Sequence, residues 1–192
     1  GYVLDSTPVS FDVTEENATQ EGTIKLVKVE KPNMAQKGSI SVEKTGEVFF
    51  GVNVSGEEGK DVIYQPVYKV KGLAGATYKI TADEDVVTPD GTLRYHKGDV
   101  VDTITTDEEG TAKSKELYLG KYTVTETKAP EGMVINKDGH QVELTYAGQE
   151  VAVTETATSF YNERQKVKIS LEKMLEQDET FGIGKNDDLT NI

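Results

Sequence analysis

Cysteine is absent from the 192-residue sequence. This absence excludes disulfide bonds and thiolate metal sites, so a secreted protein of this kind needs another way to brace its fold. Long apolar runs are also absent: no stretch approaches the ~18 residues of a transmembrane helix, and none has the basic and then apolar pattern of a signal peptide. Because the first residue is Gly1 and not methionine, we expect an excerpt from a longer protein whose targeting and anchoring signals lie outside it.

Basic side chains are outnumbered by acidic ones. The sequence has 21 lysine and arginine residues against 34 aspartate and glutamate residues, which gives a net charge of -13. A charge of this sign and size repels nucleic acid and anionic lipid. We therefore expect no nucleic-acid partner and no membrane contact within this segment.

The usual signatures of cofactor, metal and hydrolase sites are missing as well. There is no glycine-rich phosphate loop, no zinc pattern and no nucleophile elbow. Acidic clusters at Asp83–Asp85, Asp107–Glu109 and Asp187–Asp188 match no calcium-ligand spacing, and solvated loops explain them better. We expect no cofactor, no metal site and no enzyme that turns over.

The sequence is rich in threonine, valine and tyrosine, and polar and apolar side chains alternate along it. Residues 122–127 and 149–154 show this two-residue period, which is typical of strands. Turn signals such as Asp90-Gly91 and Glu109-Gly110 recur at short intervals between such stretches. The pattern predicts an all-β fold, an antiparallel β-sandwich.

A long internal repeat organises the chain. Residues 39–44 (SISVEK) reappear as residues 168–173 (KISLEK). In both places an asparagine, Asn33 or Asn162, lies eleven positions before the final lysine. The two asparagines are 129 positions apart, and so are the two final lysines. A period this long indicates whole domains in tandem and not a solenoid of small units.

The repeat also predicts the domain boundaries. Residues 1–4 are echoed by residues 131–135, with a small change of spacing that a loop insertion would produce. We therefore interpret residues 1–35 as the last strands of a preceding repeat, residues 36–165 as one complete repeat, and residues 166–192 as the start of the next.

Three apolar rows end in a polar functional group when alternate residues of a strand are taken to share a face. The rows are Ile40, Val42 and Lys44; Tyr122, Val124 and Glu126; and Phe160 and Asn162. Neighbours such as Glu43 and Thr123 point the other way and suit solvent. An amine, a carboxyl and a carboxamide are thus expected to enter one apolar interior.

Burial of these three groups predicts a specific chemistry. Loss of solvent lowers the pKa of a lysine and raises that of a glutamate, so both can be neutral there. The Lys44 amine could then attack the side-chain carbonyl of Asn162, while protonated Glu126 polarises the oxygen and passes protons to the departing ammonia. Taken singly, the residues have ordinary explanations: Lys44 extends to solvent, Glu126 lies at a strand end, and Asn162 caps a turn.

Three motifs carry a resemblance to a known family: residues 72–78 (GLAGATY), 105–110 (TTDEEG) and 117–132 (LYLGKYTVTETKAPEG). Together they resemble the SpaA-type or collagen-adhesin B-type (Cna B-like) repeat of Gram-positive surface proteins and pilins, over about residues 38–163. The resemblance implies an Ig-like or prealbumin-like sandwich. It also implies that Glu126 is the catalytic acid of an internal isopeptide bond between Lys44 and Asn162.

The sequence departs from that family in one place. Residues 45–71 separate the lysine strand from the next motif, where family members often have about a dozen residues. This insertion is expected to form an extra hairpin or a contact surface. It also makes Lys69 and Lys71 fallback nucleophiles, although the repeat favours Lys44.

The predicted function is a structural stalk or spacer repeat of a cell-wall surface adhesin or pilin-like protein, extracellular and anchored through signals outside this segment. The bond would form once, without turnover. Neighbouring repeats of the same chain are the expected partners. The alternative function is an adhesive module that binds a host extracellular matrix protein or glycan through residues 45–71.

Overall fold

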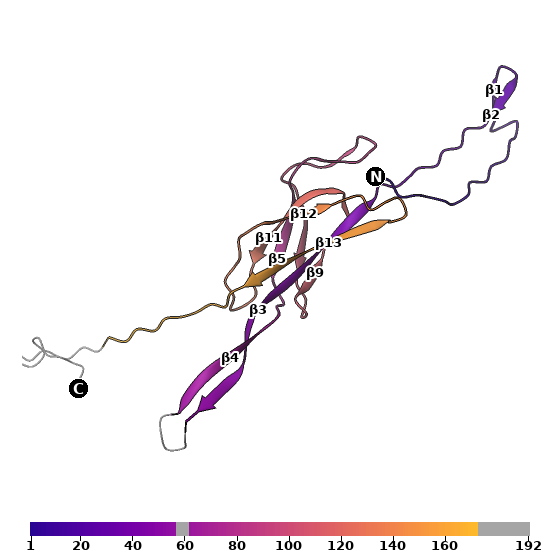
Figure 1. The fold of residues 1–192 in the computed structure, drawn as a ribbon. Helices are drawn as coiled ribbons and strands as arrows, with labels where there is room; N and C mark the ends of the chain where they lie inside the picture. The colour runs from indigo at the N-terminus through magenta and orange to yellow at the C-terminus, as the bar shows by residue number, and fades with distance from the viewer. Residues whose placement is uncertain (57–61, 173–192) are drawn as a thin grey trace, which may run out of the picture.

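The computed structural model describes residues 1–56 and 62–172 (Figure 1). Lys173 and the acidic pair Asp187–Asp188 lie outside these residues. The described residues form strands, turns and extended segments, and no helix is assigned among them. In chain order the strands are β1 (Thr19–Glu21), β2 (Ile24–Leu26), β3 (Lys37–Ser55), β4 (Ile63–Gly72), β5 (Thr77–Ala82), β6 (Val86–Val87), β7 (Leu93–Tyr95), β8 (Val100–Thr105), β9 (Thr111–Lys113), β10 (Leu117–Tyr118), β11 (Gly120–Lys128), β12 (His140–Leu144) and β13 (Val153–Asn162).

Two sheets form the body of the molecule. In the first, β3 pairs with β13 along one edge and with β10, β9 and β4 in turn along the other. In the second, the strand order is β12-β11-β5-β8. The sheets bury their apolar faces against each other, which is the arrangement of a β-sandwich. The predicted all-β sandwich is therefore confirmed.

The core lies between the sheets and follows the alternation of the sequence. Ile40 and Val42 of β3 are at most 2% exposed. Glu43, which lies between Val42 and Lys44 in the sequence, is exposed. The second sheet contributes the largest buried rings, Tyr78 of β5 and Tyr122 of β11. Burying side chains of this size supplies the main favourable term for folding, because apolar surface leaves water.

The first and last strands of the sandwich, β3 and β13, pair in parallel. Their ladder runs from Lys37 opposite Val153 to Gly46 opposite Asn162. All other ladders among the described strands are antiparallel. The parallel ladder brings residues 118 positions apart, Lys44 and Asn162, to neighbouring places on one sheet.

Strand β3 continues past the sandwich. Beyond Gly46 it pairs with β4, and residues 47–55 with residues 63–71 project as a two-stranded arm (Figure 1). Arg164 fixes the base of this arm, since its guanidinium lies 3.6 Å from the centre of the Tyr68 ring and pairs with Glu47 at 3.1 Å. The hairpin expected within residues 45–71 is confirmed.

Residues 1–35 form an excursion from the sandwich, with the β1–β2 hairpin at its far end (Figure 1). The Lys31 ammonium joins the two limbs of the excursion: it donates to the backbone oxygens of Asp5 and Thr7 and pairs with the Asp5 carboxylate at 3.3 Å.

No helix that could cross a membrane is found in the described part of the chain.

Candidate functional site

Lys44, Glu126 and Asn162 meet in the interior of the sandwich. Lys44 and Asn162 come from β3 and β13 of the first sheet, and Glu126 comes from β11 of the facing sheet. Their exposures are 0%, 3% and 1% respectively. Because each follows buried apolar residues at alternate positions, the strand period itself turns these polar groups inward.

The three side chains contact one another directly. The Lys44 Nζ lies 2.9 Å from Glu126 Oε1 and also donates a hydrogen bond to Asn162 Oδ1. The Asn162 Nδ2 donates to both oxygens of Glu126, at 3.0 and 3.1 Å. The amine, the carboxylate and the carboxamide therefore form a closed triangle of polar contacts, cut off from solvent.

The position of Glu126 differs from the expectation in one respect. The expected partner of this carboxyl is the carbonyl oxygen of Asn162, but the carboxyl contacts the amide nitrogen, and Lys44 contacts the oxygen. One carboxylate thus contacts both the Lys44 amine and the Asn162 amide nitrogen. A group placed in this way can accept a proton from the first and deliver it to the second.

Two further groups hold Glu126 in place, and neither is among the residues predicted from the sequence. The Tyr78 hydroxyl donates to Oε1 at 3.4 Å, and the backbone N–H of Asn136 donates to Oε2 at 2.6 Å. Tyr78 had a signal, because it shares its inward row with Ala76 and Ile80 and must place its hydroxyl inside. A backbone N–H in a loop leaves no such signal in the sequence.

Aromatic rings wall the site beside Lys44. The ammonium lies 5.8 Å from the centre of the Tyr78 ring and 5.7 Å from that of Phe160, and the two rings are 4.7 Å apart. The His140 ring also stacks on Phe160, with the ring centres 3.9 Å apart. The rings keep water out, so the polar contacts act in a medium of low dielectric constant.

Burial controls the protonation of Lys44. Loss of solvent lowers the pKa of this lysine below its ordinary value, and the hydrogen bond and charge of Glu126 oppose that change without cancelling it. Burial also raises the pKa of the Tyr78 hydroxyl, with a further contribution from the charge of Glu126. Burial therefore shifts Lys44 toward its neutral, nucleophilic form, beside a hydroxyl that keeps its proton.

The lowered pKa of Lys44 predicts a pH dependence in an Asn162→Ala variant, which retains Lys44 and Glu126 but cannot form the predicted cross-link. Between the lowered pKa in the folded state and 10.5 in the unfolded state, the unfolded chain binds more protons. The free energy of unfolding should therefore rise with pH through this interval. Urea denaturation at several pH values from roughly 7 to 10 measures the slope. A Lys44→Met, Asn162→Ala variant should lack this contribution, and equal slopes in the two variants would contradict the assignment.

The fallback lysines lie elsewhere. Lys69 and Lys71 are exposed on β4, and the Lys69 ammonium sits 3.2 Å from the centre of the Phe50 ring. Asn33, which the repeat matches to Asn162, is exposed in the N-terminal excursion. Of the candidate lysines within the described residues, Lys44 is thus the one that contacts Glu126 and Asn162.

Within residues 1–56 and 62–172, no group of three or more histidine, aspartate or glutamate side chains is arranged to hold a metal ion. The acidic cluster at Asp107–Glu109 has a local structural use instead. Asp107 accepts hydrogen bonds from the N–H and the hydroxyl of Thr111 at 2.7 and 2.8 Å, which lower its pKa and close a turn.

Comparison with known proteins identifies the domain. Residues 66–158 match the family model of the SpaA prealbumin-like fold domain. This segment is therefore a SpaA-type domain, and the resemblance seen in the motifs is confirmed over these residues. The match includes Glu126 and Tyr78, whereas Lys44 and Asn162 lie outside it. A comparison with curated proteins gives no significant match.

Solved structures similar to this chain include pilin subunits. One is the major pilin SpaD of Corynebacterium diphtheriae, with 24% identity, a TM-score of 0.42, and coverage of 67% of this chain and 30% of that one. The minor pilin GBS52 of Streptococcus agalactiae has 15% identity, a TM-score of 0.42, and coverage of 86% and 61%. For BcpA, the major pilin subunit of Bacillus cereus, the values are 20%, 0.37, 66% and 29%. The chain thus spans between 29% and 61% of the length of these proteins.

Proposed function

We propose that this chain is a stalk or spacer segment of an extracellular, cell-wall-anchored adhesin or pilin-like protein of a Gram-positive bacterium, braced by an isopeptide bond between Lys44 and Asn162. The observation that carries the proposal is the buried triangle of amine, carboxylate and carboxamide in a SpaA-type domain. A chain without cysteine gains from this bond the covalent brace that a disulfide gives other secreted proteins.

The reaction balances within the triangle. The neutral amine of Lys44 attacks Cγ of Asn162, a C–N bond forms, and the C–Nδ2 bond breaks. Glu126 takes a proton from the attacking nitrogen and delivers it to Nδ2, which leaves as ammonia. The products are one amide bond and one ammonia, and Glu126 returns to its starting state. The reaction occurs once in each domain, so the protein is not an enzyme that turns over.

Folding places the reacting groups of Lys44 and Asn162 next to each other. The parallel ladder of β3 and β13 holds the nucleophile beside the amide, and such placement can contribute on the order of 7 to 11 kcal/mol to the lowering of a barrier. The bond then encloses most of the sandwich, from the first strand to the last. Tension applied to the chain ends would pass through the bond, which suits a tether under shear.

The mass of the intact chain tests the proposal. We expect the mass of the sequence less one ammonia, and a protease digest that contains a branched peptide joining Lys44 to Asn162. The Asn162→Ala variant should show its full sequence mass. An unmodified mass for the folded chain would overturn the proposed bond, and a loss of two ammonias would show a second bond that the site does not account for.

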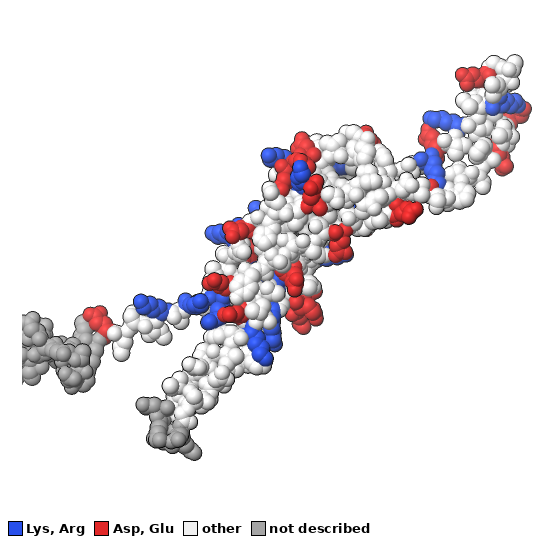
Figure 2. All heavy atoms as spheres, viewed as in Figure 1, with Lys and Arg blue, Asp and Glu red and all other residues white. Residues whose placement is uncertain are grey.

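A second candidate function, adhesion to a host extracellular matrix protein or glycan, is favoured by the surface of the arm. Residues 48–56 and 62–68 contain no charged side chain, and Figure 2 shows this part of the arm as an uncharged surface. Val54 and Tyr64 pair across its ladder and are 60% and 68% exposed. Exposed apolar side chains grouped in this way are typical of interaction sites.

Binding arrays of matrix proteins and glycans distinguish the two functions. If the arm is adhesive, the chain should bind at least one component, and a Val54→Ser, Tyr64→Ser variant should lose that binding while its melting temperature stays within a few degrees. Both positions are exposed, so the variant is expected to fold. Absence of binding by the unaltered chain would leave the stalk role alone.

A further inference from the structure

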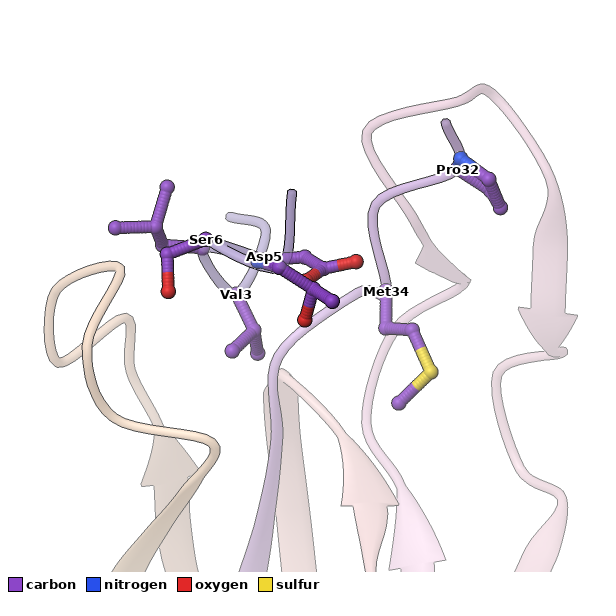
Figure 3. A pocket seen from close by; sticks show the side chains of 7 residues that line it. Val3, Asp5, Ser6, Pro32 and Met34 are labelled. Carbon is purple, nitrogen blue, oxygen red and sulfur yellow. The ribbon is translucent and has the colours of Figure 1, made fainter. Parts of the chain in front are cut away.

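Two short clasps, one at each end of the sandwich, share the same hydrogen bonds. In the N-terminal clasp, made by residues 1–4 and 34–36, Val3 N–H donates to the Met34 oxygen at 2.8 Å and Gln36 N–H donates to the Gly1 oxygen at 2.9 Å. Figure 3 shows Val3 and Met34 side by side on these two segments. An isolated antiparallel bridge joins Tyr2 to Ala35 between the two bonds.

The C-terminal clasp, made by residues 132–135 and 163–165, repeats the set. Val134 N–H donates to the Glu163 oxygen at 2.7 Å, and Gln165 N–H donates to the Gly132 oxygen at 2.8 Å. An isolated bridge joins Met133 to Arg164. Each hydrogen bond of the N-terminal clasp therefore recurs in the C-terminal clasp. The residue numbers increase by 131 on the first segment of the clasp and by 129 on the second. The second offset is the period of the sequence repeat, and residues 36–37 (QK) recur as residues 165–166 (QK).

The N-terminal clasp is docked on the loop of residues 146–152 by the side chain of Gln36. This side chain is 1% exposed. Its Nε2 donates to the oxygens of Gly148, at 2.8 Å, and Val151, and its Oε1 accepts from the Ala147 N–H at 2.9 Å. One carboxamide therefore satisfies three backbone groups of the loop, which a side chain without both donors and an acceptor cannot do.

Backbone contacts complete this docking. Leu4 N–H donates to the Gln149 oxygen at 2.7 Å, and Lys37 N–H donates to the Ala152 oxygen at 3.4 Å. The ring of Tyr146 lies against Gly1, where any Cβ would overlap it. Apolar burial contributes less: a pocket of about 350 Å³ opens beside the clasp, and Met34 on its wall is 75% exposed. The polar contacts of Gln36 therefore hold the clasp to the domain.

At the C-terminal clasp the corresponding glutamine side chain is exposed, and the space beside the corresponding glycine is open. Gln165, which corresponds to Gln36, is exposed. The space where a Cβ of Gly132 would point is open, whereas the corresponding space at Gly1 is filled by Tyr146. Ile135 and Lys166 correspond to Leu4 and Lys37, whose N–H groups bond to the loop.

We propose that the C-terminal clasp docks on the 146–152 loop of a following copy of this domain, with Gln165 inserted into that loop as Gln36 is inserted here. This inference rests on the proposed stalk role and specifies how neighbouring repeats meet. Because β3 begins at Lys37, directly after Gln36, the chain enters the next sandwich without a flexible linker. Successive domains would then be joined at a fixed angle, and the stalk would resist bending as well as extension.

Hydrogen exchange on a lengthened chain tests the joint. In this variant residues 37–165 are duplicated in place, so that Gln165 of the first copy is followed by Lys37 of the second. We expect the amide of Ile135 in the first copy to exchange at least about tenfold more slowly than in the single chain, because it gains the acceptor that Leu4 has here. Gln165→Ala in the first copy should restore the fast rate. Gln149→Ala in the second copy should not, since that residue contributes its backbone oxygen.

Equal exchange at Ile135 in the single and the lengthened chain, or no effect of Gln165→Ala, would overturn the joint. A mass loss of two ammonias in the lengthened chain shows that both copies folded and cross-linked, so a missing joint is distinguishable from a failure of the proposed bond. Should the second copy not fold, the single chain still decides: Gln36→Ala must speed exchange at Leu4 and leave Val124 in the core unchanged. An unchanged rate at Leu4 would contradict the docking role of this glutamine.

Discussion

Replacement of Glu126 by alanine is expected to abolish the loss of ammonia and to lower the free energy of unfolding by several kcal/mol. Two effects add. By analogy with a disulfide that closes a loop of this length, loss of the bond removes roughly 4 to 5 kcal/mol. The unreacted Lys44 amine is then left in the core without its carboxylate partner, and a buried amine with too few hydrogen-bond partners adds a further cost, which the lowered pKa of the lysine reduces.

Intact mass and urea denaturation measure the two parts of this prediction. Glu143→Ala is a suitable control, because Glu143 is an exposed glutamate on β12, beside β11 in the same sheet. It should keep the ammonia loss and the stability. If Glu126→Ala still lost one ammonia, the proton relay assigned to Glu126 would be wrong, even with the bond itself present.

The second large effect is mechanical. When the chain is pulled from its ends in a single-molecule experiment, the residues between Lys44 and Asn162 should not extend, because the bond carries the load. The bridge spans 118 positions. At roughly 3.5 Å for each position, its absence should release about 400 Å of additional length.

The single-molecule experiment compares the extension of the unaltered chain with that of the Asn162→Ala variant. The unaltered chain should show extension of its end segments alone, and the variant should show a further unfolding step of about 400 Å. A step of that size in the unaltered chain would mean that no covalent link shields the sandwich. The same step in Glu126→Ala would connect the mechanical effect to the chemistry of the site.

Local patterns made the inward rows predictable. The two-residue period of Ile40, Val42 and Lys44 depends on neighbouring residues alone, so it could be interpreted before any pairing was known. The motif around Glu126 likewise lies within one strand. For this reason, the residues of the candidate site and the class of fold could be proposed from the sequence.

Long-range pairing and backbone groups were beyond that reasoning. The parallel ladder that joins β3 to β13 was not predicted, because alternation is the same for parallel and antiparallel neighbours. The contact of Glu126 with the nitrogen of Asn162, and the support from the Asn136 N–H, depend on where a loop passes over the strand end. Such details are set by tertiary packing.

The internal repeat could likewise be predicted only in part. Its period was visible in the matched asparagines and lysines, but the clasps became apparent only as hydrogen bonds between segments about 30 residues apart. The assignment of residues 1–35 to a preceding repeat and of residues 166–192 to a following one stays a prediction. The equivalence of Gln36 and Gln165 supports it with specific contacts.

Electron density at the centre of the triangle tests the central claim most directly. A crystal structure of the unaltered chain should show continuous density between Lys44 Nζ and Asn162 Cγ, at the length of an amide bond, with no density for a separate Nδ2. Glu126 should lie within hydrogen-bonding distance of the new amide. Separated density for an intact amine and an intact carboxamide in the folded chain would contradict the proposed bond.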